Sequence, residues 1–186
     1  SEETAINGQW IPGPGEAFFD AVLRQMESLP IIAEDLGLIT PDVVALRQRY
    51  ELPGMRVLQF AFDSDAANVH LPHNHTADCV IYTGTHDNDT TLGWYVTRDA
   101  RTQHRARLYT GSDGSAMHWS LIRLAMTSVA DTAIIPLQDV LGLGSEARFN
   151  TPGRPYGNWA WRFKAAALRP ELAAALHELV ELSGRW

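Results

Sequence analysis

Residues 79–90 read CVIYTGTHDNDT, an apolar, β-branched run that ends abruptly in a cluster of polar side chains. A short, continuous apolar run is what a parallel sheet covered on both faces requires. Parallel α/β folds place their functional sites at the carboxyl ends of such strands. The stretch therefore predicts a buried strand over residues 79–83 and a candidate site in the turn that follows it.

Three further runs have the same character, at residues 29–33, 55–60 and 132–137. Stretches with helical spacing of apolar residues lie between and around them, at residues 15–29, 41–50, 115–129 and 170–182. Strands that alternate with helices predict an α/β fold with a parallel sheet, here of about four βα units. Periodicity alone leaves two arrangements open, an open doubly wound sheet and half of a (β/α)8 barrel.

Length and composition bound the function. The chain has 186 residues, 45% of them hydrophobic and 20% charged, which is typical of a globular protein and shorter than the roughly 250 residues of a complete (β/α)8 barrel. A net charge of −7 with scattered arginines predicts no nucleic-acid partner. No apolar run approaches the ~18 residues of a membrane span. Residues 1–4 lack a signal pattern and Cys79 is the single cysteine, so we expect a cytoplasmic protein without a membrane partner.

Glu34 and Asp35 directly follow the predicted strand at residues 29–33. A carboxyl group at the mouth of a sheet, with one side against apolar atoms, is suited to act as a general acid. The alternative is structural, a pair of carboxyl groups that cap the next turn or meet an arginine. Position alone does not decide between the two.

His86, Asp87, Asn88 and Asp89 form the polar cluster that follows residues 79–83. An ionised Asp87 could stabilise positive charge on a substrate, and His86 could donate a hydrogen bond to a neutral hydroxyl group. The alternative is a turn whose side chains bond to their own backbone. We weigh the two interpretations evenly.

Three imidazoles, those of His70, His73 and His75, lie within six residues and raise the question of a metal site. The stretch is predicted to be a loop around Pro72, and a stable metal site needs three or four ligands in fixed geometry. We therefore predict no metal. No glycine-rich phosphate loop or dinucleotide motif is present either, and we predict no cofactor.

Four blocks of the chain resemble the 4-α-glucanotransferases, a family also known as amylomaltases or disproportionating enzymes. The blocks are residues 31–41 (IIAEDLGLITP), 52–63 (LPGMRVLQFAFD), 80–95 (VIYTGTHDNDTTLGWY) and 147–153 (ARFNTPG). They occur in the family's order and extend over most of the chain. Four long matches in register are a specific signal.

The resemblance implies that residues 1–186 are the C-terminal half of a (β/α)8 TIM barrel of the α-amylase type, with no second domain. It implies transfer of α-1,4-glucan segments between malto-oligosaccharides by a retaining double displacement. Glu34 falls on the general acid/base and Asp87 on the stabiliser of the transition state. His86, Asn150, Phe60 and Asp63 fall at positions on the substrate side.

One element of the family's pattern is missing. The nucleophile is an aspartate in an Arg-x-Asp-His-Phe-Arg-type segment, and none of the acidic residues before Glu34 lies in such a segment. We therefore expect no nucleophile in this chain and little or no activity from the chain alone. Its expected partners are glucans, and either the N-terminal half of the barrel or a second copy joined through exposed sheet edges. The alternatives are a non-catalytic half-barrel that assembles or binds glucan, and an α-amylase-type hydrolase.

Overall fold

The computed structural model describes residues 6–185. Residues 1–5, which include the N-terminal stretch considered for a signal, and residue 186 lie outside the described residues. The chain divides into two compact units, Ser1–Pro53 and Gly54–Trp186, and each is described by itself.

The first unit holds two helices, α1 (Glu16–Leu23) and α2 (Pro41–Arg49). α2 begins where the sequence predicts, with Pro41 in its first turn. Arginines lie in its last turn, where their positive charge interacts favourably with the negative end of the helix dipole. The Tyr50 hydroxyl donates to Asp20 Oδ1 at 2.6 Å and to the Glu16 carbonyl oxygen at 3.0 Å, which ties α1 to the end of α2. α1 stops six residues before the predicted end at residue 29, and no residue of this helix is buried.

The predicted strand at residues 29–33 is wrong, because this segment has no regular secondary structure. A strand exists only as part of a ladder, and the Ala33 N–H makes a single ladder-like bond, to the Pro53 carbonyl oxygen at 2.9 Å. An apolar run is therefore not enough to predict a strand, because a strand also needs a neighbouring strand that completes its hydrogen bonds.

The second unit contains a three-stranded parallel sheet in the order β1-β2-β3, formed by β1 (Gly54–Val57), β2 (Cys79–Tyr82) and β3 (Thr132–Ile134). These strands confirm the predictions at 55–60, 79–83 and 132–137, although each ends early. The 3-10 helix η1 (Leu58–Phe60) follows β1 at once, and the short helix α6 (Leu137–Val140) follows Pro136. The backbone thus leaves the sheet within three residues of the end of β1 and of β3.

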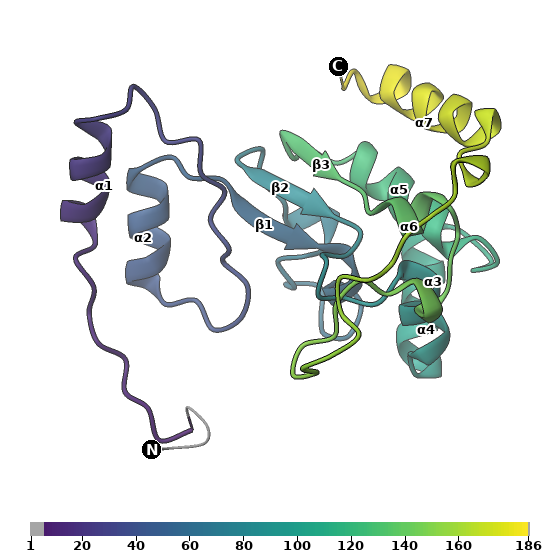
Figure 1. Cartoon of the computed structure of the whole chain (residues 1–186), viewed down its shortest axis with the longest axis horizontal. Helices are drawn as coiled ribbons and strands as arrows, with labels where there is room; N and C mark the ends of the chain where they lie inside the picture. The colour runs from purple at the N-terminus through teal and green to yellow at the C-terminus, as the bar shows by residue number, and fades with distance from the viewer. Residues whose placement is uncertain (1–5, 186) are drawn as a thin grey trace. The chain divides into compact units, whose positions relative to one another are not determined.

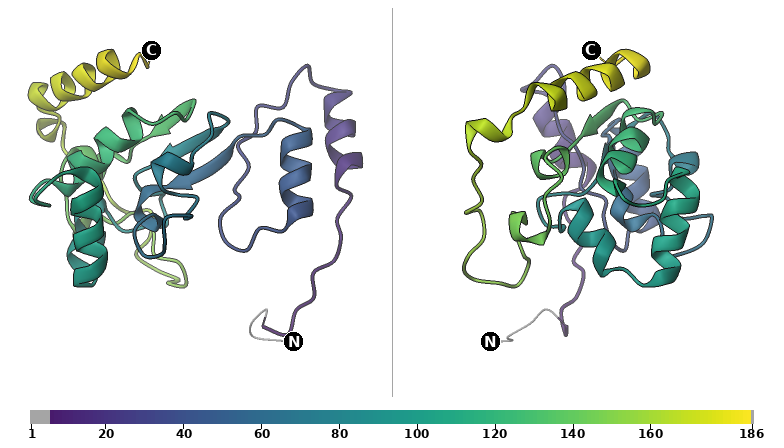
Figure 2. Two further views of the ribbon diagram at one scale, coloured as in Figure 1. Left: turned by 180° about the vertical axis from the view of Figure 1, so that it is seen from behind. Right: turned by 90° about the vertical axis from the view of Figure 1, so that its right-hand side faces the viewer.

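Four longer helices and three 3-10 turns complete this unit. They are α3 (Thr91–Thr97), α4 (Ala100–Thr110), α5 (Met117–Met126) and α7 (Pro170–Ser183), with η2 (Pro72–Asn74), η3 (Ser145–Ala147) and η4 (Ala165–Ala167). The core packs Leu58, Ile81, Met117 and Leu121 between the sheet and α5, all without exposed surface. α7 lies beside α5, where Leu179 joins a second buried cluster with Ile122 and Met126 (Figure 2).

No helix within residues 6–185 has the length and apolar character needed to span a bilayer.

Candidate functional site

The candidate site in the second unit forms around the turn that connects β2 to α3. Gly84 opens this turn, and a Cβ atom there would lie 2.5 Å from the Gln59 Nε2 atom, which real Cβ atoms do not approach. That amide nitrogen donates to the Asp89 carbonyl oxygen at 2.9 Å. Glycine therefore fits best at position 84, because this hydrogen bond holds the Gln59 side chain, which follows β1 in η1, against the turn.

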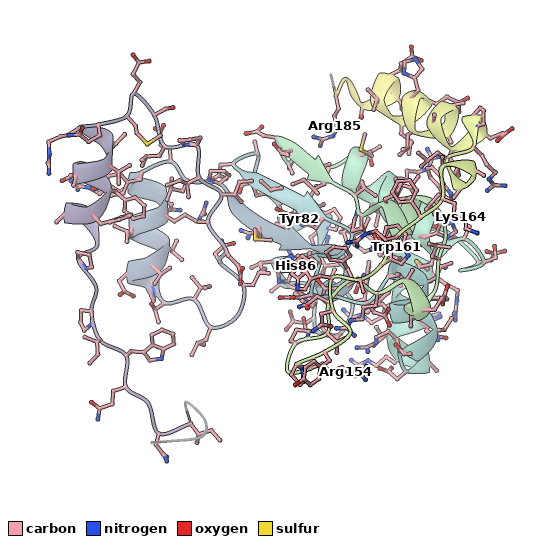
Figure 3. The ribbon with its side chains drawn as sticks, viewed as in Figure 1. Tyr82, His86, Arg154, Trp161, Lys164 and Arg185 are labelled. Carbon is pink, nitrogen blue, oxygen red and sulfur yellow. The ribbon has the colours of Figure 1, made fainter. Side chains whose placement is uncertain are left out.

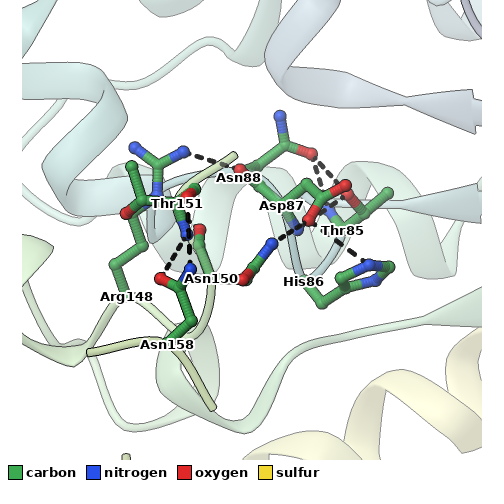
Figure 4. A network of polar contacts seen from close by, with 8 residues as sticks. All are labelled: Thr85, His86, Asp87, Asn88, Arg148, Asn150, Thr151 and Asn158. Atoms are coloured by element: carbon green, nitrogen blue, oxygen red, sulfur yellow. Dashed lines mark hydrogen bonds and ion pairs between the residues drawn. The ribbon is translucent and has the colours of Figure 1, made fainter. Parts of the chain in front are cut away.

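The turn is stabilised by its own side chains, as one of the two interpretations of this stretch predicts. Asn88 Oδ1 accepts from the Thr85 N–H at 2.8 Å and from the Thr85 hydroxyl at 2.9 Å (Figure 4). Thr85 Oγ1 in turn lies 3.3 Å from the Asp87 backbone nitrogen, which donates to it. Thr85 and Asn88 thus shape the backbone, and Asp87 is not needed for that purpose.

Asp87 makes its side-chain contacts with two other candidate residues. Its Oδ1 accepts from Asn150 Nδ2 at 2.5 Å and lies 3.3 Å from His86 Nε2, while about half of its side-chain surface stays exposed (Figure 4). Oδ2 has no hydrogen-bond partner among the described residues. The structure therefore brings together His86, Asp87 and Asn150 around a carboxyl group with one oxygen still open.

Trp159 was not identified from the sequence, yet its ring lies against His86 with the centroids 5.2 Å apart. The ring also meets the Phe149 ring edge-on at 4.7 Å, and the backbone N–H of Trp159 donates to the Phe149 carbonyl oxygen at 2.8 Å. The φ angle of Trp159 is 62°, a left-handed conformation that bulky residues rarely adopt. Such a backbone conformation persists only where the surrounding contacts compensate for its cost.

A pocket of about 310 Å³ adjoins the cluster. Its walls are mostly polar and come from the turn and from the loop after α6, and they include Asp89, Ser145, Arg148, Arg154, Tyr156 and Asn158. The Ser145 hydroxyl donates to Asp89 Oδ2 at 2.6 Å, which holds the two segments together. The walls thus combine two arginines and one aspartate with hydroxyl and amide groups.

Phe60 and Asp63 follow β1, at the carboxyl side of the sheet as expected. Phe60 is 37% exposed and its ring packs edge-on against His70 at 5.5 Å. Asp63 is exposed. Among the described residues, no hydrogen bond or ring contact joins either of them to the cluster around Asp87.

Glu34 lies in the first unit, exposed and in the irregular segment before α2. Its neighbour Asp35 pairs with Arg47, with Oδ2 and Nε 3.6 Å apart and both side chains largely buried. The structural alternative, an acidic residue that meets an arginine, thus holds for Asp35.

The three loop histidines bond to their surroundings. His70 Nδ1 accepts from the Val57 N–H at 3.1 Å, His73 contacts the Tyr109 hydroxyl and the Ala66 carbonyl oxygen, and His75 Nε2 donates to the His70 carbonyl oxygen at 3.0 Å. Burial lowers the pKa of His75, the hydrogen bond to the His70 carbonyl oxygen opposes this shift, and the nearby Arg56 and His73 lower the pKa further. Within residues 6–185, no group of three or more His, Cys, Asp or Glu side chains could hold a metal ion.

A family model described as 4-alpha-glucanotransferase matches residues 1–168. A 4-alpha-glucanotransferase of Synechocystis sp. is 52% identical over 99% of this chain and 37% of its own length. A chloroplastic/amyloplastic 4-alpha-glucanotransferase of Arabidopsis thaliana is 48% identical over 98% of this chain and 32% of its own length.

Among solved structures, the amylomaltase from Streptococcus agalactiae in complex with acarbose matches with a TM-score of 0.94 and 31% sequence identity. The match covers 99% of this chain and 38% of the amylomaltase, and the chain spans about a third of the length of the relatives it matches. The small parallel sheet with its helices is thus part of a TIM-barrel-type fold, as the resemblance implied. With a family model matched over residues 1–168, the chain belongs to the 4-alpha-glucanotransferase family.

Proposed function

We propose that this chain supplies two of the three catalytic carboxyl groups of a 4-α-glucanotransferase, in which Glu34 is the general acid/base and Asp87 stabilises the transition state. The observation that carries the proposal is the arrangement of Asp87, whose Oδ1 is held by Asn150 while Oδ2 has no partner among the described residues. An anchored carboxyl group with an open oxygen is suited to stabilise an oxocarbenium-like centre and to accept from sugar hydroxyls.

The proposed reaction is a retaining transfer in two displacements. A nucleophilic carboxylate attacks the anomeric carbon while Glu34 gives its proton to the departing glycosidic oxygen, which forms a covalent glycosyl-enzyme. Glu34 then removes a proton from the 4-hydroxyl of an acceptor glucan as that oxygen attacks the anomeric carbon and releases the nucleophile. This chemistry needs the nucleophile and the acid/base about 5–5.5 Å apart.

The nucleophile is proposed to come from outside this chain. The chain has no Arg-x-Asp-His-Phe-Arg-type segment, and its relatives are almost three times its length. We therefore expect the isolated chain to transfer no glucan. Both units are proposed to be parts of one catalytic domain.

His86, Asn150, Phe60 and Asp63 are proposed to contact the glucan. His86 and Asn150 flank Asp87 and present ring and amide groups that can bond to sugar hydroxyls. The partly exposed ring of Phe60 offers an apolar face for a sugar ring, and Asp63 offers an exposed carboxyl group. Malto-oligosaccharides are therefore the proposed substrates, with no cofactor.

The outer strands of the sheet support a second part of the proposal, assembly with another polypeptide segment. β1 and β3 are the outer strands of the described sheet, and Ile134 of β3 is 40% exposed. An unpaired edge accepts a further strand. The partner is proposed to be the N-terminal half of the barrel or a second copy, in the cytoplasm. Light scattering that shows a monodisperse monomer would exclude the second copy.

The test of activity uses maltotriose and separates transfer from hydrolysis. The chain joined to the segment that carries the nucleophile should produce glucose together with longer maltodextrins, at a constant number of reducing ends. E34Q and D87N should each slow this reaction by about a hundredfold or more. The matched controls, E171Q in α7 and D131N before β3, should leave the rate unchanged.

Transfer by the chain alone would show that it contains a nucleophile and would contradict that part of the proposal. A rise in reducing ends would indicate a hydrolase instead. If D87N transferred at the rate of D131N, the role assigned to Asp87 would be wrong.

A further inference from the structure

We infer that Arg148 is a positioning residue, which orients the Asp87 carboxyl group so that Oδ1 is engaged by the protein and Oδ2 faces the glucan. The inference deepens the proposed function and rests on the role assigned there to Asp87. Arg148 also lines the pocket beside the cluster, and the role inferred here is carried by its hydrogen bonds to the two backbone segments.

The geometry around Arg148 is a bridge between two backbone segments. Its Nε donates to the Asn150 carbonyl oxygen at 2.8 Å, and its Nη2 donates to the Asp87 carbonyl oxygen at 2.6 Å (Figure 4). Arg148 and Asp87 are 61 residues apart in the chain. One partly buried guanidinium group therefore holds the loop after η3 against the turn after β2.

The side chains of the same two residues close a ring. Asn150 Nδ2 donates to Asp87 Oδ1 at 2.5 Å, so Asp87 and Asn150 are joined once through their backbones by Arg148 and once directly. The Arg148 bonds hold the two backbones at a fixed separation, so that the Asn150 amide stays within reach of Oδ1 and restricts rotation about the Cα–Cβ bond of Asp87. Without Arg148, the Asn150 hydrogen bond and the 3.3 Å contact with His86 would have to fix the carboxyl group at a half-exposed site.

The residue type matches this task. A guanidinium group is planar and carries five N–H donors in a fixed fork, so it can reach two carbonyl oxygens at once. The ammonium group of lysine is a single point of donation on a flexible stem. Since both acceptors are neutral carbonyl groups, the geometry of the donor matters here more than its charge, and lysine should not replace arginine.

The first measurement uses the full chain without any ligand and follows the Asn150 side-chain amide by NMR after selective ¹⁵N labelling of asparagine. The wild-type amide should be protected from exchange with water by its bond to Asp87. R148A and R148K should each speed this exchange at least tenfold. R101A, which removes an exposed arginine from α4, should not change it.

A protected amide in R148A and R148K would overturn the inference. Because R148K keeps the charge and most of the length of the side chain, it still decides the question if R148A fails to fold. Addition of methylguanidinium to folded R148A should restore protection in part, which a general loss of structure would not allow.

The second measurement is transfer from maltotriose by the enzyme that includes the nucleophile segment. R148A should lower kcat about tenfold to a hundredfold and change KM less than threefold, since Asp87 acts on the transition state. A raised KM with unchanged kcat would overturn the inference, because it would assign Arg148 to substrate binding. If the wild-type enzyme transfers no glucan, the proposed function fails, and amide exchange alone then decides whether Arg148 orients Asp87.

Discussion

Two hydrogen-bonded aspartates lie beyond the carboxyl ends of neighbouring strands, and their surroundings are opposite. Asp139 in α6 is 1% exposed and accepts from the Thr83 hydroxyl at 2.5 Å, the Thr91 N–H at 2.7 Å and the Thr91 hydroxyl at 2.8 Å. Asp87 is half exposed and uses only Oδ1. The buried group joins the end of β2, the start of α3 and α6, whereas the exposed group is left with an oxygen for a ligand.

The difference shows that aspartate serves two purposes in this protein. Asp139 stabilises the elements around it, which we call the frame, and Asp87 belongs to the candidate site. A buried carboxyl group must have its hydrogen bonds satisfied by the protein, so it stabilises the elements that satisfy it. An exposed carboxyl group contributes little to stability and remains available for chemistry. We therefore expect stability and activity to respond to different aspartates.

The largest effect on stability is expected for D139A. This change leaves two buried threonine hydroxyls and one backbone N–H without their acceptor, and each orphaned group costs about 1–3 kcal/mol. The free energy of unfolding, measured with urea by circular dichroism, should fall by about 3 kcal/mol or more. D131A, a matched change at an exposed position, should stay within about 0.5 kcal/mol of the wild type. Equal stabilities of D139A and D131A would show that Asp139 does not stabilise the protein, and the contrast between Asp139 and Asp87 would be wrong.

A smaller loss of stability is expected for R185A. This variant tests whether contacts away from the candidate site stabilise the protein (Figure 3). The Arg185 guanidinium group donates to the carbonyl oxygens of Met126, Ser128, Ala130 and Asp131. It thereby holds the end of α7 to the end of α5. Loss of this guanidinium group should lower the free energy of unfolding by about 2 kcal/mol and speed amide hydrogen exchange in α7. R98A, which removes an exposed arginine, is the control, and similar exchange in both variants would contradict this role.

Acid should destabilise the second unit through two partly buried histidines. Burial lowers the pKa of both His75 and His118 below the usual 6.5, and the negative charge of Asp139 opposes the shift at His118. The unfolded chain therefore takes up protons first as the pH falls through 6.5, so the free energy of unfolding decreases towards lower pH.

The check on this prediction is the slope of stability against pH. Urea unfolding between pH 7 and pH 5 should show a shallower decrease for the H75Q/H118Q variant than for the wild type. A slope that is the same in both proteins would show that other groups cause the acid response. H177Q, at an exposed position of α7, serves as the matched control.

The smallest effect on stability is expected for D87N, within about 0.5 kcal/mol, because an amide oxygen can still accept from Asn150 at this half-exposed position. D139N should cost more, since its new N–H group faces the buried threonine donors. Thermal unfolding of the two variants measures the comparison directly. A larger loss of stability for D87N than for D139N would contradict the assignment of Asp139 to the frame and of Asp87 to the site.

Much of the site could be predicted from local sequence, and the residues show why. The turn at residues 83–90 follows a β-branched apolar run, and the pairing of Thr85 with Asn88 is a local side-chain pattern. Arg148 and Trp159 escaped notice, because their partners Asp87 and His86 lie more than 60 positions earlier. Arg148 stands inside a block that resembles the family, and an arginine beside the expected Asn150 is the signal that could have drawn attention to it.

The strand predictions succeeded and failed for one reason. Residues 80–82 pair on both sides, with β1 and with β3, and residues 29–33 have the same apolar character without a ladder. Local sequence reports how well a segment suits burial. It does not report which neighbour will complete the hydrogen bonds.

The sequence by itself determined the family, the positions of the parallel strands in the second unit and the polar turn with His86 and Asp87, because these depend on residue type and short-range order. Only the tertiary structure decided which aspartate is buried in the frame, which is open at the site, and which arginine holds the open one in place. The physical reason is that satisfaction of a carboxyl group depends on donors from distant segments. Those donors become neighbours only when the chain folds.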